Sequence, residues 1–166
     1  SEIKHTAILV MKDRKTGAVF ADAVPEKGQN QYSINLITDH IIWIGHSRVK
    51  LRSDGESSVR ALVDKIAEKL KTKGVDAVVD YTPVGESDAA GFQESAVKQV
   101  KDKIRTVWMQ ACELHFGKIL DLADDVKRQR LLPWAVQYGA QLICRTVKSP
   151  DGRSAWSLIN GRREYN

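Results

Sequence analysis

The chain has 166 residues, of which 42% are hydrophobic and 28% are charged. This length fits one compact domain with a sizeable core, and this composition excludes a disordered chain and a small disulfide scaffold. Lysine and arginine number 26 against 21 acidic residues, a formal net charge of +5. This excess permits contact with nucleic acid or another polyanion, but it is also typical of an ordinary basic surface.

Nothing in the sequence predicts membrane insertion or a cysteine-based metal site. No apolar run approaches the ~18–20 residues of a membrane-spanning helix, and the residues after Ser1 lack the pattern of a secretory signal. Cys112 and Cys144 lie in helix-like apolar surroundings, and no histidine pairs with them at zinc-site spacing. We therefore predict reduced thiols in a protein core, in a reducing intracellular compartment such as the nucleus or an organelle.

The first part of the chain is predicted to form a hairpin followed by a helix. The apolar segments 7–11 and 18–24 flank the charged turn 12–17, which is typical of two paired strands. After a loop at 25–28, isoleucines recur every three or four residues, as on the apolar face of a helix. They are Ile34, Ile37, Ile41 and Ile44. Gly45 is expected to end this helix.

The middle of the chain alternates strands and helices. Residues 49–54 are predicted to form a short strand, and a helix capped by Ser57 or Ser58 follows it. The apolar side of that helix consists of Val59, Leu62, Val63, Ile66 and Leu70. Residues 75–81 are expected to be the next strand, and a turn at 83–85 leads into a long helix from Ser87 to about Phe116.

The last third of the chain is predicted to be mainly helical. Residues 120–130 fit a loop or a short helix, and Pro133 suits the first turn of a helix that continues through Cys144. A turn at 149–152 and a basic tail at 161–163 follow. The order of elements predicts an α/β architecture with a mixed sheet. We expect one domain over 1–166, with the sheet and main helices in 1–116 and a C-terminal helical extension with the basic tail in 117–166.

Five segments carry a recognisable pattern in chain order: residues 10–28, 51–56, 83–87, 132–134 and 151–155. Together they resemble the catalytic core of retrotransposon and retroviral-type integrases, and the resemblance covers nearly the whole chain. It implies a ribonuclease-H-like fold, a mixed sheet flanked by helices. It also implies a first, central strand ahead of Ala7–Met11, for which these residues offer no candidate. We therefore expect an N-terminally truncated or degenerate core, whose sheet is completed by a missing N-terminal segment or a protein partner.

The resemblance implies a partial metal site. Integrases of this kind use two aspartates and a glutamate to hold two divalent ions, usually magnesium, that cut and join DNA strands. Asp54 matches the second position and Glu94 the third, with 39 residues between them. No residue matches the first: Glu2, Asp13 and Asp22 are expected to be surface residues. Two carboxylates should bind metal weakly, so Mg²⁺ is the expected cofactor only if a third carboxylate is supplied.

Three basic residues follow Glu94 on the same face of the predicted helix. Lys98, Lys101 and Arg105 lie four, seven and eleven residues after it. One interpretation is nucleic-acid binding, since similar integrases carry basic residues at the first two of these places to hold DNA phosphates. The other is a solvated helix face with a Glu94–Lys98 ion pair. The sequence leaves both open.

The chain departs from the family pattern at the site. Relatives carry amide side chains before the glutamate, where this chain has Asp88 and Ala90, and an asparagine where it has Cys144. These changes weaken the expectation of an intact active site. Trp43 and Trp108 lie on or beside apolar helical stripes and are expected in the core, so no tryptophan is assigned a function.

Two hypotheses follow from these observations. The first, slightly favoured, is a retroelement-derived domain that is catalytically incomplete and serves as a binding or structural subunit of a larger assembly, such as an organellar ribosome. The second is a magnesium-dependent integrase core that carries out DNA strand transfer, with the first catalytic aspartate supplied by upstream sequence. DNA or RNA is a possible partner under either hypothesis.

Overall fold

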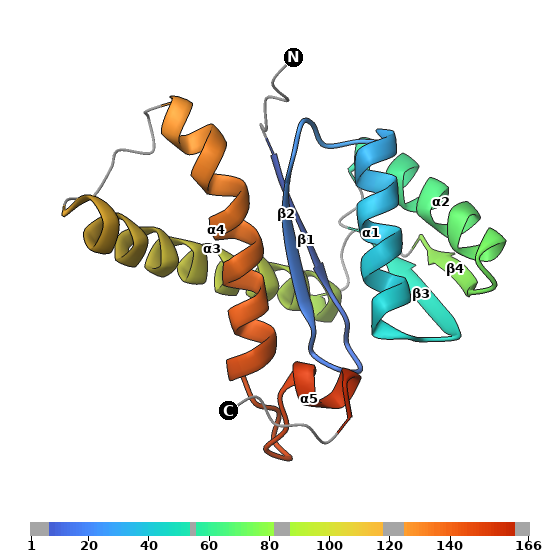
Figure 1. Ribbon diagram of the computed structural model, residues 1–166. Coiled ribbons are helices and arrows are strands. Elements are labelled where there is room, and N and C mark those ends of the chain that lie inside the picture. Colours follow the sequence, from blue (N-terminus) through green and yellow to red (C-terminus); the bar gives the residue numbers. More distant parts are fainter. Residues whose placement is uncertain (1–6, 54–55, 82–86, 118–124, 162–166) are drawn as a thin grey trace. The chain divides into compact units, whose positions relative to one another are not determined.

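The computed structural model describes residues 7–53, 56–81, 87–117 and 125–161 (Figure 1). The elements in chain order are β1 (Ala7–Lys12), β2 (Val19–Val24), α1 (Gln31–Ile44), β3 (Arg48–Arg52), α2 (Ser57–Thr72), β4 (Asp76–Asp80), α3 (Ser87–Phe116), α4 (Asp125–Thr146) and α5 (Ala155–Ile159). The chain forms two compact units. Unit 1 consists of Ser1–Pro25 and Glu94–Asn166, and unit 2 of Glu26–Gln93. The expectation of a single domain over the whole chain stays a prediction.

The predicted hairpin is confirmed in unit 1. β1 and β2 pair antiparallel, with Ala7 opposite Val24 at one end and Lys12 opposite Val19 at the other. The turn is held by Asp13, whose Oδ2 accepts bonds from the backbone N–H and the hydroxyl of Thr16, at 2.9 and 2.6 Å. Gly17 adopts a positive φ of 75° there, a conformation that glycine reaches without strain.

The core of unit 1 is built where α4 packs on β2 (Figure 1). Its buried residues are Ala18, Val19, Ala21, Val100, Val136, Ala140, Ile143, Cys144 and Ala155. A second cluster joins α3 to α4 through Val107, Trp108, Cys112 and Ala135. Where the two helices meet, Gly139 lies against Ile104, and a Cβ at this position would be in van der Waals contact with it at 3.5 Å.

The start of α4 differs from the prediction. The helix begins at Asp125, so Pro133 lies inside it and not in its first turn. A proline within a helix has no N–H to donate to the carbonyl oxygen four residues earlier, and it therefore destabilises the helix by about 3 kcal/mol. Here Leu131 and Ala135, on either side of the proline, pack in the cluster with α3, and this packing favours a continuous helix. The short helix α5 was not predicted.

Unit 2 begins with the predicted helix α1. The side chain of Asn30 caps it by accepting a bond from the Ser33 N–H at 2.9 Å. Gly45 ends it in the left-handed conformation, with a φ of 85°. Both the isoleucine periodicity and the glycine stop are therefore confirmed. Trp43 is 41% exposed, in contrast to the expected core position, whereas Trp108 is buried as expected.

The strands of unit 2 pair parallel, from Arg48 opposite Asp76 to Arg52 opposite Asp80. One face of this pair carries the less exposed residues Val49, Leu51, Ala77 and Val79, and α2 packs on the pair with Leu62, Ile66 and Leu70 buried. The opposite face carries ion pairs, of which Arg52–Asp80 is formed at 2.6 Å and Lys50–Asp80 at 2.9 Å. Alternation of apolar and charged residues thus sets the orientation of both strands.

The described strands form two separate two-stranded sheets, one antiparallel and one parallel. This is the mixed α/β architecture that the sequence predicts. Among the described residues, β1 has only β2 as a strand neighbour, and β3 has only β4. None of the helices in these residues is long and apolar enough to cross a membrane.

Candidate functional site

Glu94 and the three basic residues lie on α3, as the sequence predicts. Its buried side consists of Ala96, Val100, Val107, Trp108 and Cys112. Glu94, Lys98, Lys101 and Arg105 are all exposed. The helix therefore directs its apolar stripe toward the core of unit 1 and leaves the carboxylate and the basic residues accessible to solvent.

Among the described residues, the Glu94–Lys98 ion pair that one of the two interpretations includes is not formed. The ion pairs observed in this part of the chain are formed by other side chains. From Lys98 to Arg105 the helix advances about 10 Å, so three positive charges follow one another along this face, with the exposed Asp102 beside them. Such a row can bind consecutive phosphates of a nucleic acid.

Asp54, the second predicted carboxylate, lies outside the described residues. Its position relative to Glu94 is therefore an expectation of the sequence alone. Glu2 also lies outside them, and so do the side chains of residues 87–90, which include the departures at Asp88 and Ala90.

Asp22 is not the surface residue that was expected. It is 3% exposed, and its Oδ1 accepts a bond from Gln137 Nε2 on α4 at 3.0 Å. The expectation was wrong because α4 covers β2, and this bond joins residues 115 positions apart, which no local pattern indicates. Asp13, the other described alternative, binds the hairpin turn through Thr16.

The described residues do not by themselves make a magnesium site. They contain no group of three or more histidine, cysteine, aspartate or glutamate side chains that could hold a metal ion. Glu94 lies on an exposed helix face, and Asp22 is bonded to Gln137. A hard divalent cation needs several oxygen ligands that converge on one point, which this part of the chain does not supply.

Cys144 has a structural role where α4 meets β2. Its Sγ accepts a bond from the Val19 N–H at 3.2 Å and donates to the Val19 carbonyl oxygen at 3.1 Å. Burial raises the pKa of the Cys144 thiol, which favours the protonated, donating form. Cys112 and Cys144 are both free and buried, so the prediction of core thiols without a disulfide is confirmed.

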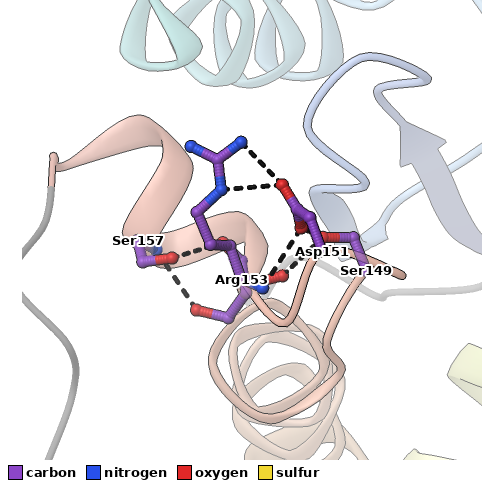
Figure 2. Close-up of polar contacts among 5 residues, drawn as sticks. Ser149, Asp151, Arg153 and Ser157 are labelled. Atoms are coloured by element: carbon purple, nitrogen blue, oxygen red, sulfur yellow. Dashed lines mark hydrogen bonds and ion pairs between the residues drawn. The ribbon is translucent and has the colours of Figure 1, made fainter.

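The motif at residues 151–155 is a turn that leads into α5 (Figure 2). The Arg153 guanidinium binds the Asp151 carboxylate at 2.6 Å, and the Ser149 hydroxyl lies within hydrogen-bonding reach of both the Asp151 carboxylate and the Arg153 carbonyl oxygen. Ser154 then caps α5 by accepting a bond from the Ser157 N–H at 3.2 Å. Hydrogen bonds from Ser149 and Arg153 lower the pKa of the Asp151 carboxyl to about 2. The hydrogen bonds and the ion pair described in this motif hold the turn and the start of α5 in place.

The chain has the mixed α/β, ribonuclease-H-like fold of integrase catalytic cores. The catalytic core domain of BIV integrase matches 92% of this chain and 84% of its own, with a TM-score of 0.56 and 16% identity. The HTLV-2 integrase catalytic core domain, solved in complex with magnesium, matches 92% of both chains, with a TM-score of 0.54 and 12% identity. No family model and no curated protein matches the sequence. At these identities the likeness concerns the fold.

Proposed function

We propose that this chain is a retroelement-derived binding domain with an integrase fold, and that it acts as a structural subunit of a larger assembly such as an organellar ribosome. The observation that carries the proposal is the outer edge of β1. Within the described residues this strand pairs with β2 alone, and an exposed strand edge is a ready acceptor for another strand.

The register identifies the groups that such a strand would meet. In an antiparallel pair, successive residues turn their N–H and C=O groups alternately toward the partner and away from it. Val19 binds Cys144 with both backbone groups, so it faces away from β1. By alternation along the paired strands, Met11 faces β2, whereas Ile8 and Val10 direct their backbone groups to the outer edge of β1.

The side chains of β1 favour a strand that is buried on both faces. The strand has the sequence AILVMK, with apolar residues at five successive positions, and Ile8 is 38% exposed. Near-continuous apolar strands are typical of sheet interiors, where both neighbours are present. We propose that a protein partner or an N-terminal segment of the same protein supplies the missing neighbour.

Hydrogen exchange tests this proposal. In the isolated chain the amide protons of Ile8 and Val10 should exchange rapidly, and in the purified assembly they should be protected. Ile8→Lys places a charge on the edge strand and should prevent assembly. Val78→Lys, at a site that is 53% exposed on β4, is the matched control and should assemble normally. Protection of Ile8 and Val10 in the isolated monomer would contradict the proposal.

The second candidate is magnesium-dependent DNA strand transfer. It is supported by the exposure of Glu94 beside Lys98, Lys101 and Arg105 on one face of α3. In this case Asp54 and Glu94 would hold Mg²⁺ together with an aspartate from upstream sequence, and the metal would activate the attacking oxygen and stabilise the leaving one. The three basic residues would bind DNA phosphates.

Strand transfer by the full-length protein tests this candidate. Asp54→Asn and Glu94→Gln should each abolish product formation, whereas Glu113→Gln, at another exposed carboxylate of α3, should leave it unchanged. Product formation that persists in the first two variants would rule out these residues as metal ligands in the reaction.

A further inference from the structure

We propose that the exposed face of α4 binds single-stranded nucleic acid by stacking an unpaired base on Trp134. This surface, which we call the α4 platform, consists of Arg130, Trp134, Tyr138 and Gln141. All four side chains are exposed. Their spacing of four, four and three residues puts them on one side of the helix.

The two aromatic rings are already stacked on each other. Their centroids lie 5.3 Å apart and their planes differ by 11°, which is an offset parallel arrangement. Trp134 nevertheless remains 48% exposed and Tyr138 38% exposed. The tyrosine ring therefore fixes the orientation of the indole while leaving flat aromatic surface open. A nucleobase can extend this stack without first ordering the tryptophan side chain.

The backbone beneath the platform is fixed by packing on two sides. Ala135 is fully buried in the cluster with α3, and Val136 is fully buried in the cluster with β2. Gly139, next to Tyr138, lies against Ile104 of α3. Aromatic side chains on a helix held in this way lose little conformational freedom when a ligand binds.

The charge of the platform favours a polyanion. Residues 130–146 contain two arginines and no acidic residue. The Arg145 guanidinium lies 4.8 Å from the centre of the Trp156 ring, whereas Arg130 is exposed one turn before Trp134 and is placed for a phosphate. Single strands combine phosphates with unstacked bases. Duplex DNA offers the same phosphates, but its bases are already stacked within the helix.

Binding of a fluorescein-labelled oligothymidylate of about 12 nucleotides to the full chain tests the proposal. Trp134→Ala should weaken binding about tenfold or more, since the loss of one stacked base is worth that factor. Trp134→Phe, which keeps a smaller ring, should give an intermediate affinity. Trp43→Ala, at an exposed tryptophan of α1, is the matched control and should bind like the wild type.

Tryptophan fluorescence provides a second measurement, which does not depend on the stability of the alanine variant. The oligonucleotide should quench emission in the wild type and in Trp43→Phe, but much less in Trp134→Phe. Unchanged affinity of Trp134→Ala would overturn the proposal, and so would equal wild-type affinity for the single strand and the matching duplex. Equally effective competition by polyglutamate would also overturn it, because that result would indicate an acidic protein as the partner.

Discussion

The thiol of Cys144 on α4 bonds both backbone groups of Val19 on β2. The two bonds, at 3.2 and 3.1 Å, satisfy the N–H and C=O groups of Val19. In a larger sheet a neighbouring strand would bind these two groups. An asparagine, the residue that the sequence resemblance implies at this position, also offers one donor group and one acceptor group. Cysteine therefore retains the hydrogen-bonding capacity of asparagine where α4 meets β2.

Cys144→Ala should destabilise the protein more than Cys112→Ala. Both changes remove a buried sulfur atom, but only the first leaves the N–H and C=O groups of Val19 without their partner. An unsatisfied buried group costs about 1–3 kcal/mol, and this is the expected difference between the two free energies of unfolding in urea. Equal destabilisation would show that the sulfur atoms contribute only packing. Cys144→Ser should recover part of the stability.

Ser33→Ala should be neutral or stabilising. Ser33 is fully buried in α1, and its hydroxyl has no hydrogen-bond partner within the described part of the chain. Removing an unsatisfied buried hydroxyl removes its desolvation penalty. Asn30→Ala, in the same helical turn, removes the capping bond to the Ser33 N–H and should cost about 0.5–2 kcal/mol. The melting temperature of Ser33→Ala should be higher than that of Asn30→Ala. The reverse order would contradict the assignment of an unsatisfied hydroxyl to Ser33.

Asp151→Asn should show a defect that depends on pH. Because bonds from Ser149 and Arg153 lower the pKa of Asp151 from 3.8 to about 2, folding favours the ionised carboxylate. Its stabilisation is present above pH 3.8 and disappears as the pH falls toward 2. The melting temperatures of wild type and variant should therefore differ near neutral pH and converge in acid. Asp39→Asn, at an exposed residue of α1, should show no such convergence.

Charge reversal on α3 distinguishes a DNA-binding face from a solvated one. If Lys98, Lys101 and Arg105 bind phosphates, replacing all three by glutamate should weaken duplex binding and reduce its salt dependence. The slope of log affinity against log salt should fall in magnitude by about 0.9 for each phosphate that is no longer neutralised. Reversal of the exposed Lys71 and Lys73 near the end of α2 is the control. Unchanged binding of the triple variant would identify a solvated helix face.

The local elements could be predicted from the sequence because their signals are local. Isoleucine spacing and Gly45 defined α1, and the charged turn at residues 12–17 defined the hairpin. The motif segments also indicated the fold that the solved integrase cores share. In each case residues close together in the chain carried the information.

The packing of α4 could not be predicted, because it joins distant parts of the chain. The burial of Asp22 and the bonds between Cys144 and Val19 depend on residues 115 and 125 positions apart. The helix also continues through Pro133, against its local propensity, where packing with α3 favours it. Of the predicted site, Glu94, Lys98, Lys101 and Arg105 are exposed on α3, and their binding role stays a prediction. Its relation to Asp54 stays a prediction.

The position of α4 along β2 also limits how copies of this chain can associate. Edge-to-edge growth into a filament requires two accepting edges on every molecule, so that each copy can both receive and offer a strand. At Val19 the outer edge of β2 is occupied by Cys144, and Ala21 and Ala23 farther along β2 are buried. Two copies that meet through β1 would therefore form a closed pair of hairpins, because α4 covers the other edge of each hairpin at Val19.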